Sequence, residues 1–297
     1  MEVPLDDAAS ASSRAALGSY YDRLAQWTAA ARHFGYGGGR HKLTVHRALA
    51  DPRAGGRATV TRLHDVLLGA LPSPLTGHVL DAGCGLGGTM LDLAARSSAR
   101  FTGLTLSEQQ AAVGRAAAAK AGLADRIAIE VRSYDSPPHG PFDLAIAIES
   151  LAHSPHPDSS IGAIAARLAP GGRLAVVDDM PELQARGTRD LELFQSGWRV
   201  PALAGVAQIR AMLALHGLAI VADRDLTEEL RPRTLSRIAT LETLNRALHR
   251  LAPSAGLREL LDSYRGGLAL ERLYRTALIR YRLIIAEKLA SRPASTR

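Results

Sequence analysis

The chain has 297 residues, of which 46% are hydrophobic, so it can bury one large core with a smaller cap or two modest domains. Its single cysteine excludes an internal disulfide and a multi-cysteine zinc site. The sequence contains no uncharged apolar run of about 18 residues that could cross a membrane. The N-terminal segment lacks the pattern of a signal peptide, so we expect a cytoplasmic protein.

The net charge of +7 is concentrated near the C-terminus, where residues 223–297 carry 15 Lys and Arg against 9 Asp and Glu. These arginines are spaced among leucines and alanines, without a basic block and with few aromatic residues for base stacking. We therefore expect no nucleic-acid partner. The spaced arginines indicate either a solvated helix face or a surface that holds a phosphate-bearing substrate.

Strands and helices are predicted to alternate along the chain, which is typical of a parallel sheet covered by helices. Apolar spacing predicts a helix over 58–71, a buried strand over 78–83 and a helix over 88–96. Further predicted strands cover residues 99–107, 125–133, 142–150, 173–180 and 218–227, with helices over 107–123, 159–168 and 206–217. The remainder, 235–290, reads as helical with a break at 253–256.

The stretch HVLDAGCGLGGTML, residues 78–91, joins the first of these buried strands to a helix through closely spaced glycines. It satisfies GxGxxG, the dinucleotide pattern, and also DxGxGxG, which includes Asp81. In a site of low dielectric, Asp81 would repel a pyrophosphate and attract a cation. S-adenosylmethionine carries a sulfonium and an ammonium, so it fits the stretch better than a dinucleotide or a turn without a ligand.

With these residues the chain resembles a class I S-adenosylmethionine-dependent methyltransferase. VLDAGCGLGG resembles the family's first motif, FDLAIAIES the strand that lines the active site, and LAPGGRLAVVDD the fifth strand with its turn. GLTLSEQQ resembles the small-molecule branch that contains tocopherol and prenyl-diphosphate C-methyltransferases. The resemblance implies an α/β, Rossmann-like, mostly parallel sheet of seven strands with helices on both faces.

The same resemblance implies how the chain is divided. A helical cap over 1–72 would precede the cofactor-binding core over 73–226, which would carry an acceptor-pocket insertion near 180–205. A helical lid over 227–297 would complete the fold. The branch also implies a homodimer or a higher homo-oligomer.

Many family members end the second strand with an acidic residue that binds the ribose, but residues 104–107 contain none. In the named branch, main-chain groups and a glutamine replace that acid, and the end of the third strand lies near the adenine. The cofactor residues implied in this way are Asp81, Gly83, Cys84, Gly85, Gly87, Thr105, Leu106, Gln110, Ser133, Tyr134 and Tyr36. Arg132 and Asp135 compete with Ser133 and Tyr134 for the adenine, and the Cys84 side chain reads as a packing residue rather than a nucleophile.

Two candidate catalytic residues, Glu149 and His153, directly follow the fourth strand and so lie where ligands of open α/β sheets bind. In the prenyl-diphosphate methyltransferases, a glutamate at this place stabilises a carbocation or removes a proton. His153, His156 and Asp158 have ligand chemistry, but their spacing fits no metal motif, so we expect no metal there.

Aromatic residues are scarce in the chain but gather in its first 36 residues. In the related branch this segment closes over the cofactor, which makes Tyr21 and Phe34 candidate substrate contacts. Phe194 and Trp198 follow the fifth strand, where an acceptor pocket usually forms.

These residues predict methyl transfer from S-adenosylmethionine to a small, largely apolar metabolite, at carbon rather than at nitrogen or oxygen. One alternative is Mg²⁺-dependent C-methylation of a prenyl diphosphate, bound by arginines and histidines of the cap. The other is a protein that binds S-adenosylmethionine and catalyses a cyclisation or rearrangement without methyl transfer.

Overall fold

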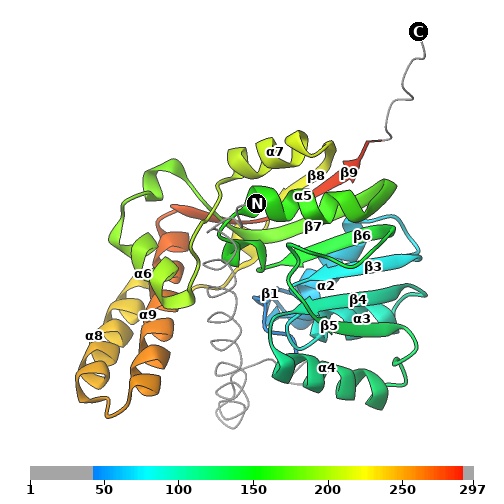
Figure 1. Ribbon diagram of the computed structural model, residues 1–297. Coiled ribbons are helices and arrows are strands. Elements are labelled where there is room, and N and C mark those ends of the chain that lie inside the picture. The colour runs from blue at the N-terminus through cyan, green and yellow to red at the C-terminus, as the bar shows by residue number, and fades with distance from the viewer. Residues whose placement is uncertain (1–42, 290–297) are drawn as a thin grey trace, which may run out of the picture.

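The computed structural model describes residues 43–289, in which a seven-stranded sheet lies between two layers of helices (Figure 1). Its strands are β3 (His78–Ala82), β4 (Arg100–Thr105), β5 (Ile127–Val131), β6 (Phe142–Ile148), β7 (Leu168–Pro181), β8 (Leu218–Asp225) and β9 (Ile279–Lys288). Their spatial order is β5-β4-β3-β6-β7-β9-β8. β9 runs antiparallel to both of its neighbours, β7 and β8, while the other six strands of this sheet share one direction, so their carboxyl ends meet at one edge.

The helices cover both faces of the sheet. They are α2 (Thr61–Ala70), α3 (Gly88–Ala95), α4 (Glu108–Lys120), α5 (Pro157–Arg167), α6 (Arg189–Trp198), α7 (Val206–Leu215), α8 (Leu235–Leu251) and α9 (Ala255–Arg275). Buried side chains of α2, α3 and α4 belong to one core cluster, and those of α5 and α7 belong to the cluster on the opposite face. A small hairpin of β1 (Leu49–Ala50) and β2 (Ala58–Thr59) precedes α2.

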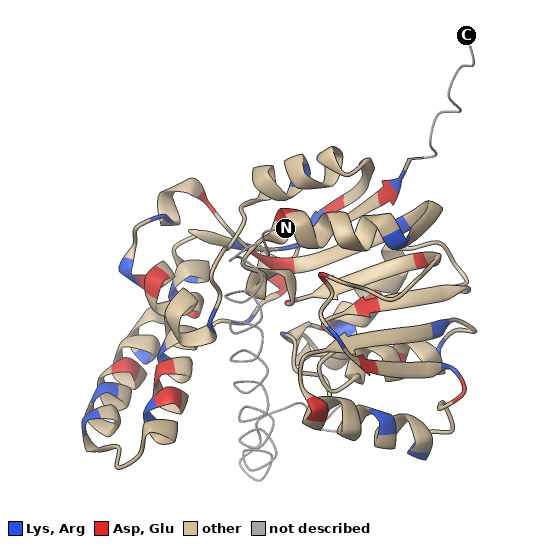
Figure 2. Cartoon of the chain, viewed as in Figure 1, with Lys and Arg blue, Asp and Glu red and all other residues tan. Residues whose placement is uncertain are grey.

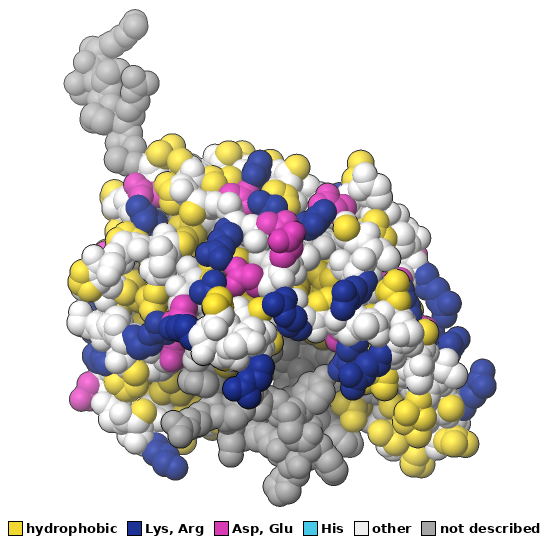
Figure 3. All heavy atoms as spheres, turned by 180° about the vertical axis from the view of Figure 1, so that it is seen from behind, with side chains coloured by type: hydrophobic (Ala, Val, Ile, Leu, Met, Phe, Trp, Pro, Cys, Tyr) yellow, Lys and Arg dark blue, Asp and Glu magenta, His cyan; other side chains and the backbone are white. Residues whose placement is uncertain are grey.

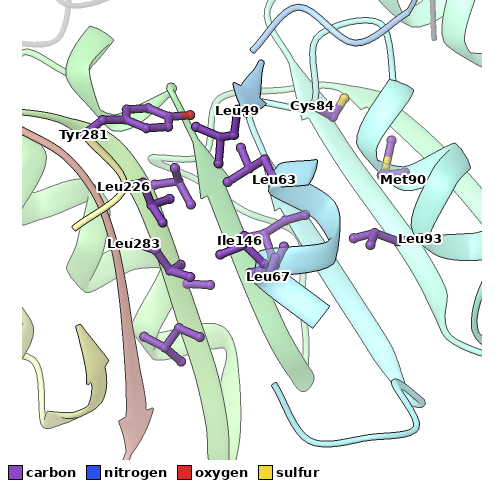
Figure 4. Close-up of a cluster of buried hydrophobic side chains, with 14 of the residues drawn as sticks. Leu49, Leu63, Leu67, Cys84, Met90, Leu93, Ile146, Leu226, Tyr281 and Leu283 are labelled. Carbon is purple, nitrogen blue, oxygen red and sulfur yellow. The ribbon is translucent and has the colours of Figure 1, made fainter. Parts of the chain in front are cut away.

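The main core lies between α2 and the middle of the sheet (Figure 4). Leu63 and Leu67 of α2 face Ile146 of β6 and Leu283 of β9, and all four are at most 1% exposed. Tyr281 of β9 lies at the edge of this cluster and is fully buried. Burial of each such apolar side chain contributes about 1.5–3 kcal/mol, which fixes the strand ends that carry the polar residues described below.

The predicted α/β class, the mostly parallel seven-stranded sheet and its helices on both faces are confirmed. The strand, glycine turn and helix predicted over 78–96 are present as β3 and α3. The predicted break at 253–256 separates α8 from α9.

The prediction that residues 235–290 are helical apart from the break at 253–256 is wrong for residues 279–288, which form β9. This strand lies between β7 and β8, so both of its faces are covered. Ile284, Ile285 and Ala286 are consecutive buried residues, and a strand buried on both faces loses the alternation that distinguishes it from a helix. The segment predicted as a C-terminal helical lid therefore supplies one strand of the core.

Helices α8 and α9 form a hairpin beside the sheet, and both carry acidic and basic side chains along their lengths (Figure 2). Arg272 bonds Asp190 of α6 and Glu242 of α8, both at 2.6 Å. These ion pairs join the helices to one another. Figure 3 shows hydrophobic side chains gathered at the free end of the hairpin, where Leu248 is 47% and Leu251 is 79% exposed.

Candidate active site

The glycine turn after β3 has a backbone that ordinary residues rarely adopt. Gly83, Gly85 and Gly87 have φ of +100°, +54° and +78°, in the left-handed region that favours glycine. A Cβ added to Gly83 would lie 2.5 Å from Cβ of Ser150, which follows β6. The turn therefore packs directly on the end of the neighbouring strand, and α3 begins immediately after it.

Asp81 lies inside the sheet just before this turn and is 3% exposed. Its Oδ2 is buried and has no hydrogen-bond partner among residues 43–289. Burial raises the pKa of this carboxyl to about 7. A buried carboxylate without a partner is costly, and a cationic ligand at the turn would supply the missing counter-charge. The turn and Asp81 therefore fit S-adenosylmethionine.

The predicted cofactor residues after β4 are close to one another. The Thr105 hydroxyl donates to Oε1 of Gln110 at 2.7 Å, and both side chains are buried. Ser107 caps α4 by accepting from the Gln110 amide at 3.0 Å. Leu106 lies in the same turn and is partly exposed. The bond from Thr105 orients the side-chain amide of Gln110. The role of Gln110 toward a ligand stays a prediction.

The two favoured adenine residues bond to the protein. The Tyr134 hydroxyl donates to the carbonyl of Ser150 at 2.9 Å, and burial raises its pKa. The Ser133 hydroxyl donates to Asp135 at 2.8 Å. The Tyr134 bond thus connects the end of β5 to the end of β6. Its acceptor, Ser150, is also the residue that contacts Gly83.

Cys84 lies in close, buried surroundings that are typical of a packing residue. Its amide donates to the Leu104 carbonyl at 2.8 Å, and a Cβ on Gly103 would lie 2.8 Å from its Sγ. Burial and the nearby Asp81 raise the pKa of the thiol well above its usual range. A buried neutral thiol is a poor nucleophile.

Glu149 follows β6 with φ of +50°, and its carboxylate is held from several sides. Oε1 accepts from the Arg47 amide at 2.8 Å and from the Tyr281 hydroxyl at 2.7 Å. Oε2 lies 2.8 Å from Nη1 of Arg47. Burial would raise the pKa of Glu149, but the charge of Arg47, with smaller effects of His46 and of these hydrogen bonds, lowers it.

Arg47 is the centre of a buried cluster that the sequence prediction missed. Its Nη2 lies 2.6 Å from Oδ2 of Asp179, at the end of β7. Its Cζ lies 5.2 Å from the ring centroid of Trp198, 5.8 Å from that of Tyr274 and 5.4 Å from that of Tyr281. Such rings favour a cation near their faces. The Tyr274 hydroxyl donates to Asp179.

Asp178, the neighbour of Asp179, accepts from the amides of Ala152 at 3.0 Å and Asp179 at 2.9 Å. Burial, with the adjacent charge of Asp179, raises the pKa of Asp178 to about 8. Burial also raises the pKa of Asp179, against the charge of Arg47. The end of β7 therefore holds more carboxyl groups than Arg47 can neutralise.

His153 lies one short turn beyond Glu149, and its Nδ1 is 3.3 Å from the carbonyl of Arg199. Because a carbonyl only accepts, Nδ1 carries the proton in the neutral ring and the lone pair is on Nε2. Burial lowers the pKa of His153, so the ring is neutral at physiological pH. Asp158 instead pairs with His216 at 3.1 Å.

Phe194 and Trp198 of α6 contact each other, with ring centroids 5.4 Å apart. Phe194 is 1% exposed and belongs to the core. Trp198 donates from Nε1 to the carbonyl of Ser263 at 2.9 Å, which fixes its ring beside Arg47. Of Phe194 and Trp198, both predicted substrate contacts, only Trp198 lies beside Arg47 and its cluster.

Tyr21, Phe34 and Tyr36 lie outside the described residues. Within residues 43–289, no group of three or more His, Cys, Asp or Glu side chains is arranged to hold a metal. The helices of that same range include none long and apolar enough to span a bilayer.

A methyltransferase domain model matches residues 80–174, from the middle of β3 to the middle of β7. The chain is 33% identical to the 27-O-demethylrifamycin SV methyltransferase of Amycolatopsis mediterranei, over 61% of this chain and 68% of that protein. It is 32% identical to the O-methyltransferase cnsE of Penicillium expansum, over 56% of this chain and 60% of that protein. The chain spans less than two thirds of the length of several curated relatives, cnsE among them.

Two solved structures have the same fold. The [4+2]-cyclase SpnF superposes with a TM-score of 0.70 at 21% identity, over 92% of this chain and 95% of that one. The geranyl diphosphate C-methyltransferase of Streptomyces coelicolor gives a TM-score of 0.65 at 17% identity, over 93% and 98%. Together with the rifamycin relative and the cofactor turn, these findings show that the chain belongs to the class I S-adenosylmethionine-dependent methyltransferases.

Proposed function

We propose that the chain transfers a methyl group from S-adenosylmethionine to a hydroxyl oxygen of a small, largely apolar metabolite. The observation that carries this proposal is the packing of Gly83 on Ser150. Ser150 directly follows Glu149 and comes three residues before His153, so the glycine turn packs on the segment that carries both candidate catalytic residues. Of the two curated relatives described above, cnsE is named an O-methyltransferase, and the other is named a methyltransferase of 27-O-demethylrifamycin SV.

Asp81 and the turn from Gly83 to Gly87 would hold the cofactor, whose cationic end compensates the buried carboxylate. When bound, S-adenosylmethionine supplies an electrophilic methyl group. The protein then has to position the acceptor, exclude water and remove a proton.

His153 is the group best suited to remove that proton. Its neutral ring has the lone pair on Nε2, and its lowered pKa keeps the ring unprotonated near pH 7. Nε2 of His153 would accept the hydroxyl proton of the acceptor during methyl transfer, and the sulfur of the cofactor would keep the electron pair of the bond to the transferred methyl group.

Glu149 is less suited to act as a base, because Arg47 and Tyr281 stabilise its ionised form. We assign it an electrostatic role beside the transferred methyl group, where a fixed negative charge favours developing positive charge. Glu149 would therefore stabilise positive charge, and His153 would accept the proton.

Methylation at carbon is the second candidate, as the resemblance predicts. Glu149, which Arg47 and Tyr281 keep ionised, would stabilise a cationic carbon centre. A proton on that carbon could again pass to His153. The atom that receives the methyl group distinguishes the two candidates.

The test uses purified protein, deuteromethyl S-adenosylmethionine and an extract of producing cells, with products followed by mass spectrometry and the labelled atom located by NMR. We expect a product heavier by one labelled methyl group. His153→Gln should slow its formation by roughly 10²-fold or more. His156→Gln, an exposed histidine of the same loop, is the matched control and should stay within about twofold.

Label at oxygen supports the proposal, and label at carbon replaces it with the second candidate. A strict requirement for Mg²⁺ would favour a prenyl diphosphate acceptor. Undiminished transfer in His153→Gln would remove His153 from the mechanism.

A further inference from the structure

A buried chain of hydrogen bonds connects the helix after the glycine turn to the Arg47 cluster. Oδ2 of Asp92, on α3, lies 2.8 Å from Nδ1 of His64, on α2. Nε2 of His64 lies 2.9 Å from Nε2 of His46, and Nδ1 of His46 lies 3.0 Å from the carbonyl of Arg47. His64 is fully buried and His46 is 9% exposed. None of these groups is used in the mechanism above.

Counting protons gives the charge of this chain. A carboxylate and a carbonyl can only accept, so Nδ1 of His64 and Nδ1 of His46 must each carry a proton. The bond between the two Nε2 atoms needs one more proton. Two imidazoles therefore share three protons, one more than two neutral rings hold, and the pair is a monocation whose counter-ion is Asp92.

The charges around the pair agree with this count. Burial, and then the charge of His64, lower the pKa of His46 to about 4. His64 bonds a carboxylate, whereas His46 bonds a neutral carbonyl, so the position of Asp92 assigns the extra proton to His64. The hydrogen bond and charge of His64, with those of Arg96, lower the pKa of Asp92 against the effect of burial. Arg96 bonds Asp92 at 3.1 Å and Asp65 at 2.6 Å, which closes the network at the surface.

The segment held by His46 touches both halves of the site. We call residues 43–50 the strap. A Cβ on Gly88 would lie 2.4 Å from Oγ1 of Thr44, so the strap lies against the start of α3. Three residues later, the Arg47 amide and guanidinium bind Glu149. The histidine pair anchors the strap between these two contacts.

We propose that His46 and His64 form a protonated positioning pair, balanced by Asp92, that holds the strap so that Arg47 stays clamped on Glu149 and Asp179. The assignment of Glu149 to the active site rests on the proposed function, but the clamp itself does not. Because Asp92 is on the helix that follows the glycine turn, the pair connects the cofactor side of the site to the acceptor side.

The first test is ¹⁵N NMR of histidine-labelled protein at pH 7, with His64→Gln used to assign the His64 signals. We expect both nitrogens of the His64 ring to be protonated. Asp92→Asn should abolish this imidazolium signature. Asp158→Asn, which removes the carboxylate from the separate pair with His216, is the matched control and should preserve it. Neutral rings at both His46 and His64 in the wild type would overturn the proposal.

The second test is hydrogen exchange of the Arg47 amide, which donates to Glu149. Asp92→Asn should raise its exchange rate by about tenfold relative to amides in the centre of β3. His46→Leu should do the same, because leucine can bond neither His64 nor the Arg47 carbonyl. An unchanged exchange rate of the Arg47 amide in Asp92→Asn and His46→Leu would mean that the histidine pair only fills space and does not hold the strap. Neither test needs an acceptor, so both remain decisive if the proposed methyl transfer fails.

Discussion

Replacing Asp81 by asparagine should stabilise the protein without cofactor while weakening cofactor binding. The pKa of Asp81 is about 7 in the folded chain because the side chain is buried. This lies roughly three units above the value for an unfolded chain, and each unit corresponds to about 1.4 kcal/mol. Full ionisation of the buried carboxyl therefore costs the native state roughly 4 kcal/mol.

The sign of the pH dependence follows from the raised pKa. Between about pH 4 and pH 7 the unfolded chain has released this proton while the folded chain keeps it, so the contribution of Asp81 to native stability falls as pH rises. Asparagine does not titrate. We expect Asp81→Asn to exceed the wild type in free energy of unfolding by roughly 1–2 kcal/mol at pH 5 and roughly 3–4 kcal/mol at pH 8.

The assay is urea unfolding at both pH values, followed by far-ultraviolet circular dichroism without cofactor. Asp125→Asn, in an exposed turn, is the control and should change stability by less than about 0.5 kcal/mol. Titration calorimetry should show at least about a tenfold loss of S-adenosylmethionine affinity in Asp81→Asn. A stability difference that is the same at pH 5 and pH 8, or a variant that binds cofactor normally, would refute the reasoning.

Three further predictions concern the same site. Cofactor affinity of the wild type should increase as pH rises through about 7, with proton release measured by calorimetry in two buffers, because the cation selects ionised Asp81; a flat profile would count against it. Arg47→Met should lower the free energy of unfolding, measured with urea, by about 3–5 kcal/mol, because the carboxylates of Glu149 and Asp179 lose their partner. An unchanged free energy of unfolding would mean that these ion pairs add nothing to stability. Gly83→Ala should abolish cofactor binding that calorimetry can detect, because its Cβ would collide with Ser150. Gly122→Ala has positive φ but open space around the added Cβ, so it should lower the free energy of unfolding by only about 1 kcal/mol. Equal effects of the two variants on cofactor binding would contradict the role of the close packing on Ser150.

The strand, glycine turn and helix that carry Asp81 were predictable because their signals are local. Asp81 and the glycines are adjacent in sequence, and their strand, turn and helix follow from apolar spacing and the need for positive φ. Glu149 and His153 were placed at the same edge because parallel strands end together.

The Arg47 cluster was not predictable, because its members come from distant segments without a local pattern. The hydrogen bond from Tyr281 to Glu149 spans 132 residues of sequence, and that from the Arg47 amide spans 102. The position of Tyr281 depends on β9, which the sequence pattern presented as helix. Without that strand between β7 and β8, Tyr281 could not be brought to the carboxyl end of β6.

In the proposed reaction, the chain consumes S-adenosylmethionine by methyl transfer. This reaction is tested most directly by the amount of S-adenosylhomocysteine released for each molecule of acceptor converted, measured by mass spectrometry during turnover with the purified wild type. We predict a ratio of about one, because each acceptor would take one methyl group. Conversion of the acceptor with bound cofactor but without S-adenosylhomocysteine would contradict this proposal and favour a cyclisation or rearrangement instead.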